Sequence, residues 1–232
     1  GDAKVYHPQD QMAPMYEMKA FLDNSFDRVS QALEGIGNTP EEKQDIKAFM
    51  VEMFNRTQNG TIAHPPVHDN GDAQTVGYAC EVMRWFKPAL TVVNMSAVDG
   101  CHSNFTGYLA ALHRADHSVG HLWNFIQTQI PEMAGNTVLI VVPECGRNDE
   151  PNAIRDQNDW YAYDHSDANA LRIFGMMAGP GLQAGLRVGD ADQPVGLATD
   201  VVPTIAEILG IKEDVMGAGL IDGASLSLFD RI

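Results

Sequence analysis

Five side chains in this sequence carry groups that commonly bind metal ions, four of them after short apolar runs and the fifth in a long connection. They are Asp99, His102, Glu144, Cys145 and His165. Carboxylate, imidazole and thiolate ligands together suit zinc, and manganese fits if the thiol takes no part. Calcium is a further alternative. A divalent ion at such a site would lower the pKa of a bound water molecule or polarise a phosphoryl oxygen.

The same residues also admit a purely structural interpretation. Asp99 and His102 could cap the helix that follows them, and Glu144 and Cys145 could simply turn the chain, since no contiguous zinc signature such as CxxC or HExxH is present. A second histidine set has the spacing i, i+4, i+8, which places its members on one helix face. This set is His113, His117 and His121, and it fits a metal-binding face, a pH-sensitive surface or a solvated helix flank.

The elements that must position the five candidate ligands are apolar runs alternating with a helix. Runs at Leu90–Met95, Thr137–Val142 and Ile173–Ala178 predict strands buried on both faces, and a helix is expected from about Asn104 to Gln129. This order predicts an α/β fold, a three-layer sandwich with a mainly parallel sheet that is incomplete at its N-terminal side. Ligands in such folds lie beyond the carboxyl ends of the strands, where Asp99, His102, Glu144 and Cys145 stand, and His165 lies in the long connection between the second and third predicted strands.

The chain before residue 89 has a different character. Periodic apolar residues predict helices over 12–33, from Pro40 after the Thr39 capping box, and over 74–86, with a loop over 58–72. A last helix is expected over 201–209. We therefore expect a helical and loop segment at 1–88 that packs on the sheet, and an α/β half-domain at 89–232.

Composition excludes some functions of this 232-residue chain. Its 15 basic and 31 acidic residues give a net charge of −16, which disfavours binding to nucleic acid or to an anionic membrane surface. No uncharged apolar run approaches the roughly 20 residues that a membrane span needs. The first residues lack the apolar core of a signal peptide, so the chain either is not exported or has lost a leader. Three cysteines, Cys80, Cys101 and Cys145, make no disulfide framework.

Taken in order, four motifs resemble the C-terminal half of the alkaline phosphatase superfamily, over about Leu90 to Ile211. They are V-D-G-C-H-S-N, then N-T-V-L-I-V-V-P-E-C-G-R-N, then D-H-S-D, and finally D-V-V-P-T-I-A-E-I-L-G. This superfamily includes alkaline phosphatases, nucleotide phosphodiesterases, sulfatases and cofactor-independent phosphoglycerate mutases. Many of its members are secreted, so the resemblance implies an extracytoplasmic location.

The resemblance implies roles for the candidate ligands. Asp99, His102 and His165 match the Asp, His and His that bind one ion, and Glu144 and Cys145 match an Asp-His pair at a second ion. The matches are imperfect. The first motif has a spacing of three where members usually have four, Glu144 stands where Asp is usual, and Cys145 stands where His is usual. Thiolate still binds zinc, so an altered second site is expected.

The implied function is a metal-dependent hydrolase of phosphate or sulfate esters, most similar to phosphodiesterases. Such enzymes use an N-terminal strand that ends in a metal-binding Asp, followed by a Ser, Thr or formylglycine nucleophile. Residues 1–88 contain no such strand, and no sulfatase-type Cys/Ser-x-Pro-x-Arg sequence is present. The chain is therefore expected to be a C-terminal part without its nucleophile, and a second chain that supplies the missing N-terminal strand is an expected partner. Alternatively, it is a non-catalytic binding or assembly protein that reuses a degenerate half-fold.

Overall fold

The computed structural model describes residues 39–67, 71–102, 104–153, 155, 158–159, 161–221 and 223–231, with the side chain of Cys101 left out. The chain divides into two compact units, residues 1–63 and residues 64–232. The helix expected over 12–33 lies outside the described residues. Within the described residues, no helix is both long enough and apolar enough to cross a membrane.

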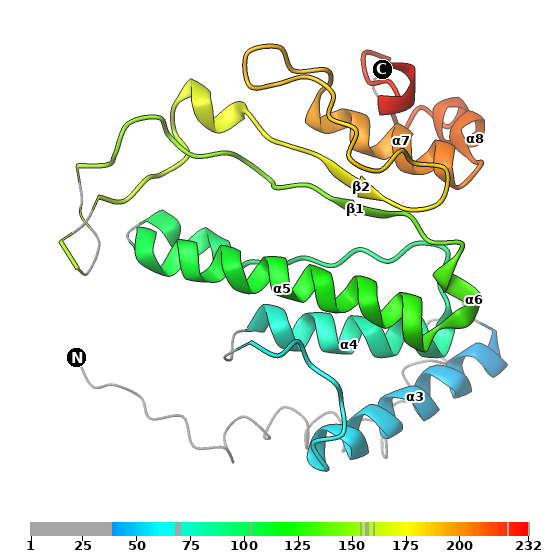
Figure 1. The fold of residues 1–232 in the computed structure, drawn as a ribbon. Helices are drawn as coiled ribbons and strands as arrows, with labels where there is room; N and C mark the ends of the chain where they lie inside the picture. The colour runs from blue at the N-terminus through cyan, green and yellow to red at the C-terminus, as the bar shows by residue number, and fades with distance from the viewer. Residues whose placement is uncertain are drawn as a thin grey trace. The chain divides into compact units, whose positions relative to one another are not determined.

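Helix α3, Pro40–Gln58, is the described helix of the first unit (Figure 1). Its N-terminus has the capping box that the sequence predicts. The Glu42 backbone N–H donates to the Thr39 hydroxyl over 3.2 Å, and the Thr39 N–H donates to the Glu42 carboxylate over 2.6 Å. Two backbone donors that the helix itself leaves unpaired are satisfied in this way. Met53 and Phe54 are its buried residues.

Two long helices, α4 at Gly71–Phe86 and α5 at Phe105–Gln129, form the centre of the second unit (Figure 1). Asn104 caps α5 by accepting a hydrogen bond from the Gly107 N–H. The helices share one core cluster, made of Val76, Cys80, Met83, Leu122, Phe125, Ile126 and Ile130. A fully buried aliphatic side chain contributes roughly 2 kcal/mol, so this cluster is the main source of stability in the second unit. Burial also raises the pKa of the Cys80 thiol to about 12.

The remaining helical elements of the second unit are short. They are η1 at Ala97–His102, α6 at Pro131–Ala134, η2 at Ala168–Leu171, η3 at Ala198–Asp200, α7 at Val201–Ile208, α8 at Lys212–Gly217 and η4 at Leu228–Asp230, where η denotes a 3₁₀ helix. Helix α7 starts where the sequence predicts it and contacts η3, α8 and η4.

The sheet corrects the predicted fold class. Strand β1, Leu139–Val141, pairs with β2, Met176–Ala178, and the two strands are antiparallel, with Ile140 opposite Met177. This pair is the sheet found in the described part of the chain. The prediction of a three-layer sandwich with a mainly parallel sheet is therefore wrong.

The first predicted strand is wrong because its apolar run buries only one face. Residues 90–95 are extended, but they pair with no strand among the described residues. Val93 and Met95 pack against the core cluster, whereas Val92, which directly precedes Val93, is 81% exposed. A run of β-branched residues looks the same in sequence whether one face or both faces are covered, so composition alone cannot separate the two cases.

The connection between β1 and β2 explains why the strands are antiparallel. Parallel neighbours need a crossover that carries the chain back to the same end of the sheet, and this crossover is usually a helix packed on one face. Between residues 142 and 175, the described residues contain no α-helix, only the short 3₁₀ turn η2 and an isolated antiparallel bridge between Arg155 and Tyr161. The chain instead runs outward from β1 and returns directly into β2 in the opposite direction.

The C-terminal part is held by a buried ion pair around Asp200, which is 0% exposed. Arg231 donates to both carboxylate oxygens, over 2.5 Å and 3.0 Å, and the N–H groups of Leu197 and Leu226 donate over 2.7 Å and 3.0 Å. Burial alone would raise the pKa of Asp200, but the hydrogen bonds from Arg231 and from these two backbone groups outweigh it and lower the pKa. The charged form is therefore the one that the fold stabilises.

Replacing Asp200 with Asn should lower the free energy of unfolding by roughly 3 kcal/mol, because one partner of a buried pair is removed. The native pKa of Asp200 lies below its unfolded value of about 3.9, so its contribution is present above that pH. It is lost as the pH falls through the native pKa. Urea unfolding at pH 7 and at pH 3 measures both effects. The control is the D116N variant, because Asp116 is exposed. Equal stability of D200N and wild type at pH 7 would contradict this account.

Candidate metal centre

Asp99 and His102 are brought together by the 3₁₀ turn η1. A 3₁₀ helix has three residues per turn, so side chains at i and i+3 lie directly above one another. The carboxylate Oδ1 of Asp99 is 3.0 Å from Nε2 of His102. A spacing of three residues is thus the one that places both side chains on the same face of this turn.

The start of η1 is fixed by a carboxylate from helix α4. The buried side chain of Asp72 accepts hydrogen bonds from the N–H groups of Ser96, over 3.0 Å, and of Ala97, over 3.1 Å. Ser96 directly follows residues 90–95, and Ala97 is the first residue of the turn. Helix α4 therefore holds the turn at a defined position relative to the core.

Residues 148–167 bring His165 to the same place. Asn152 donates to the backbone carbonyl of His102 over 3.1 Å and accepts the N–H of Asp164 over 2.8 Å, so it links η1 directly to the segment that carries His165. Asn148 accepts the N–H groups of Ser166 and Asp167 over 2.6 Å and 2.9 Å. The two asparagine amides thus add to the backbone hydrogen bonds across this connection, which run from the Asn148 N–H to the Asp164 carbonyl and from the Asn152 N–H to the Ala162 carbonyl.

The three side chains present their ligand atoms to one point. Nε2 of His165 lies 3.4 Å from Nε2 of His102, and the ligand atoms of Asp99, His102 and His165 all lie within 4.8 Å of one another. In a tetrahedral zinc site with bonds of 2.0–2.1 Å, neighbouring ligand atoms are about 3.3 Å apart. The separations of 3.0 Å between Asp99 and His102 and 3.4 Å between the two imidazoles are close to this value, and the third pair lies within 4.8 Å. The arrangement and the donor set, one carboxylate and two imidazoles, therefore fit a divalent ion such as zinc.

His102 also has the outer partner that metal-binding histidines usually have. Its Nδ1 donates to Oδ1 of Asp164 over 2.7 Å, which leaves Nε2 on the side of Asp99 and His165. This hydrogen bond is the main cause that raises the pKa of His102; partial burial opposes the shift and the bond to Asp99 adds to it. The N–H of His165 and then the ring of His102 lower the pKa of Asp164. The two carboxylates thus favour a positive charge between them.

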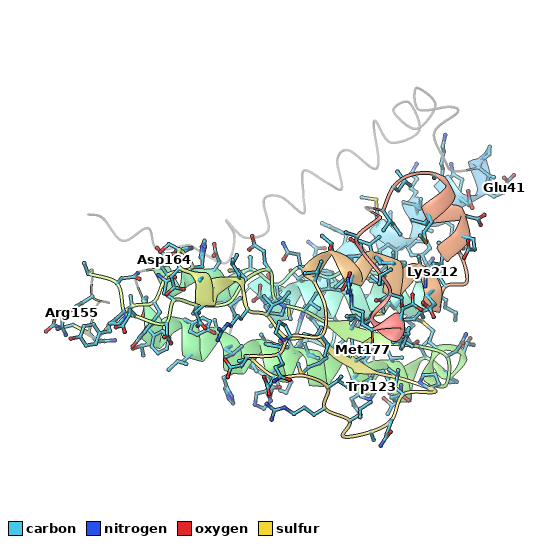
Figure 2. The ribbon with its side chains drawn as sticks, turned by 90° about the horizontal axis from the view of Figure 1, so that it is seen from above. Glu41, Trp123, Arg155, Asp164, Met177 and Lys212 are labelled. Atoms are coloured by element: carbon cyan, nitrogen blue, oxygen red, sulfur yellow. The ribbon has the colours of Figure 1, made fainter. Side chains whose placement is uncertain are left out.

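The structure separates the five predicted ligands into two sets. Asp99, His102 and His165 converge, and in the described part of the chain they form the one group of three or more such side chains able to hold an ion. Glu144 is exposed and Cys145 is half-buried, and neither belongs to this group. Their role at a second ion remains a prediction. Figure 2 shows Asp164 near one end of the second unit, well away from Met177 of β2.

Three residues of this centre were not identified in the sequence, namely Asp72, Asn152 and Asp164. For Asp164 a signal existed, because it directly precedes His165, and a carboxylate beside a metal-binding histidine often supports a ligand. For Asp72 and Asn152 no signal existed, since their partners are backbone groups 24 and 50 residues away in the chain.

The other histidine set has a different environment. The rings of His113 and His117 lie 4.5 Å apart between centroids on the exposed face of α5, beside Pro66 and Val67. His121 is partly buried and contacts Phe125. The three therefore do not share one environment, and none belongs to the group around Asp99. His68, from the same loop as Pro66, lies outside the described residues.

Comparison with models of known families, with curated proteins and with solved structures finds no match to this chain. The resemblance to the alkaline phosphatase superfamily therefore depends on the ordered motifs alone. The convergence of Asp99, His102 and His165 is a separate observation, because it comes from the geometry of the chain.

Gly146 allows the segment after β1 to approach the turn η2 closely. Its N–H donates to the Ala170 carbonyl over 2.7 Å, and an added Cβ would lie 2.5 Å from the Arg172 carbonyl oxygen and 3.1 Å from that of Asn169. These are backbone atoms, so the two segments must separate. Replacing Gly146 with Ala should therefore cost about 2 kcal/mol of stability.

Urea unfolding of the G146A variant tests this close approach. The matched control is G120A on α5, where an added Cβ meets nothing within 4 Å. Because Ala favours a helix over Gly, the control should be unchanged or slightly more stable. If G146A were as stable as the control, the two segments would not be in contact as described.

Proposed function

We propose that Asp99, His102 and His165 bind one divalent metal ion, with zinc the best fit, and that this ion serves the hydrolysis of phosphate or sulfate esters. The observation that supports the ion most directly is the meeting of Oδ1 of Asp99 with Nε2 of His102 and Nε2 of His165. The order of motifs supports the reaction class, with phosphodiesters first among the substrates.

The ion and its three ligands would have different roles. When bound, the ion would polarise the ester oxygen or lower the pKa of a water molecule. Asp99 offsets part of its positive charge, and the two imidazoles act as neutral ligands that leave a net charge at the centre. This residual charge would attract an anionic ester, although the chain as a whole carries −16. All three ligands are solvent-accessible, so a small ester can reach them.

The metal centre predicts one zinc ion per chain. Removing a ligand, as in H102A or H165A, should weaken zinc binding by more than about 100-fold, beyond the 10–100-fold effect typical of supporting residues. Isothermal titration with zinc against a competing chelator measures this change. The matched controls are H113A and H117A, which remove exposed imidazoles from α5 and should bind zinc as the wild type does. Zinc binding that survives in H102A and H165A but is lost in the controls would overturn the site.

The reaction class predicts that the zinc-loaded chain binds inorganic phosphate or sulfate and that the metal-free chain does not. Turnover needs a nucleophile as well as an ion, so anion binding tests the role of the centre without depending on that nucleophile. Titration of both forms with each anion gives the result, and hydrolysis of an aryl phosphodiester gives a second readout. A zinc-loaded chain that binds neither anion would contradict the hydrolase proposal and leave only a metal site.

A second candidate function, binding or assembly without turnover, is favoured by the extended segment 90–95. Its backbone groups make no hydrogen bonds to other described residues. Leu90 and Val92 are exposed, whereas Val93 and Met95 are partly buried against the core cluster. An extended segment with open donors and acceptors can accept a strand from another chain. We propose that a second chain supplies this strand in the assembled protein.

Hydrogen exchange distinguishes this candidate function. Amides of Thr91–Met95 should exchange rapidly in the isolated chain, and they should become protected if the chain assembles at high concentration. The V92K variant changes an exposed side chain and should keep the fold while preventing assembly. Rapid exchange of these amides at every concentration would argue against an assembly role.

A further inference from the structure

The carboxylate of Asp164 connects the two histidines of the centre through a single oxygen atom. Oδ1 accepts a hydrogen bond from Nδ1 of His102 over 2.7 Å and another from the backbone N–H of His165 over 2.8 Å. Both distances are short, as expected when the acceptor is ionised. One oxygen therefore fixes the ring of the first ligand and the backbone of the second.

The first of these bonds determines which ring nitrogen of His102 can bind an ion. A neutral imidazole has one N–H and one free lone pair, and the nitrogen that donates to a carboxylate is the protonated one. Nε2 lies 3.0 Å from Oδ1 of Asp99, which competes for the ring proton, but the contact of Nδ1 with Asp164 is the shorter one at 2.7 Å. In the neutral ring the proton is therefore on Nδ1, and the lone pair is on Nε2, the atom that faces Asp99 and His165. In the other tautomer, Nε2 would carry the proton and could not accept an ion.

The second bond makes the positions of the two histidines dependent on each other. His102 belongs to η1, and His165 lies 63 residues further along the chain, in the connection between β1 and β2. Asn152 links the backbones of the two segments, because its hydrogen bonds go to the His102 carbonyl and the Asp164 N–H and to neither imidazole ring. Among these linking contacts, it is Asp164 that reaches a ligand ring.

We infer that Asp164 is a positioning residue: its Oδ1 holds His102 as the Nδ1–H tautomer, with Nε2 open to the ion, and keeps His165 next to it. This inference rests on the proposed metal centre. It adds a fourth residue that does not itself bind the ion but sets the geometry and the protonation of those that do.

The test compares D164A, D164N and wild type, and it has two readouts. Nitrogen-15 NMR of the histidine rings, at a pH where His102 is neutral, reports the tautomer directly and needs no metal. We expect the Nδ1–H form in wild type and its loss in D164A. Zinc titration should show affinity lowered 10–100-fold in D164A. The Asn oxygen of D164N can still accept from Nδ1, so this variant should keep the tautomer and recover part of the affinity.

The matched control is D167A in the same connection. Asp167 accepts the N–H groups of Asp149, Asn169 and Ala170, so its removal loosens the same loop without touching either histidine. D167A should lose stability but keep the His102 tautomer. If D164A kept the tautomer, or if D167A lost it equally, the positioning role would be overturned. A wild-type chain with the expected tautomer but no zinc binding would instead contradict the proposed metal centre.

Discussion

In this chain, aspartate side chains accept hydrogen bonds from backbone N–H groups that a neighbouring strand would satisfy in a sheet. Asp72, Asp164, Asp167 and Asp200 each accept backbone N–H groups from segments that have no ladder partner, as the hydrogen bonds to Ser96, His165, Asn169 and Leu226 show. Unpaired buried N–H groups cost as much as a lost hydrogen bond. A carboxylate satisfies two or three of them at once. Part of the charge of −16 is therefore structural, in addition to any role at the surface.

This way of holding the backbone explains why the candidate site lies on irregular chain. Neither η1 nor the connection after β1 belongs to a sheet, yet both meet at the N-terminal end of α5, close to its Asn104 cap. The core cluster of α4 and α5 provides a rigid base, and Asp72 transfers that rigidity to η1. Sites on loops are precise only when other groups lock the loops. Here Asn148, Asn152 and Asp164 are those groups.

The helices could be predicted from the sequence because their signals are local. The Thr39 capping box and the period of α5 depend on residues within a few positions of each other. The sheet could not be predicted, since pairing depends on which segment lies beside another, and the runs at 90–95 and 173–178 are equally apolar whatever their partners. The meeting of Asp99, His102 and His165 was expected from the resemblance, with a parallel sheet as the scaffold. The structure reaches the same meeting through a 3₁₀ turn and side-chain hydrogen bonds.

The buried thiol of Cys80 offers a way to follow the core itself. Only a thiolate reacts quickly with alkylating reagents, and a pKa of about 12 keeps this thiol protonated near neutral pH. Because Cys80 is also fully buried between α4 and α5, a reagent can modify it only after the two helices separate. The rate of its modification would thus report the opening of the core. This rate depends on the population of molecules in which the packing of α4 against α5 is momentarily lost.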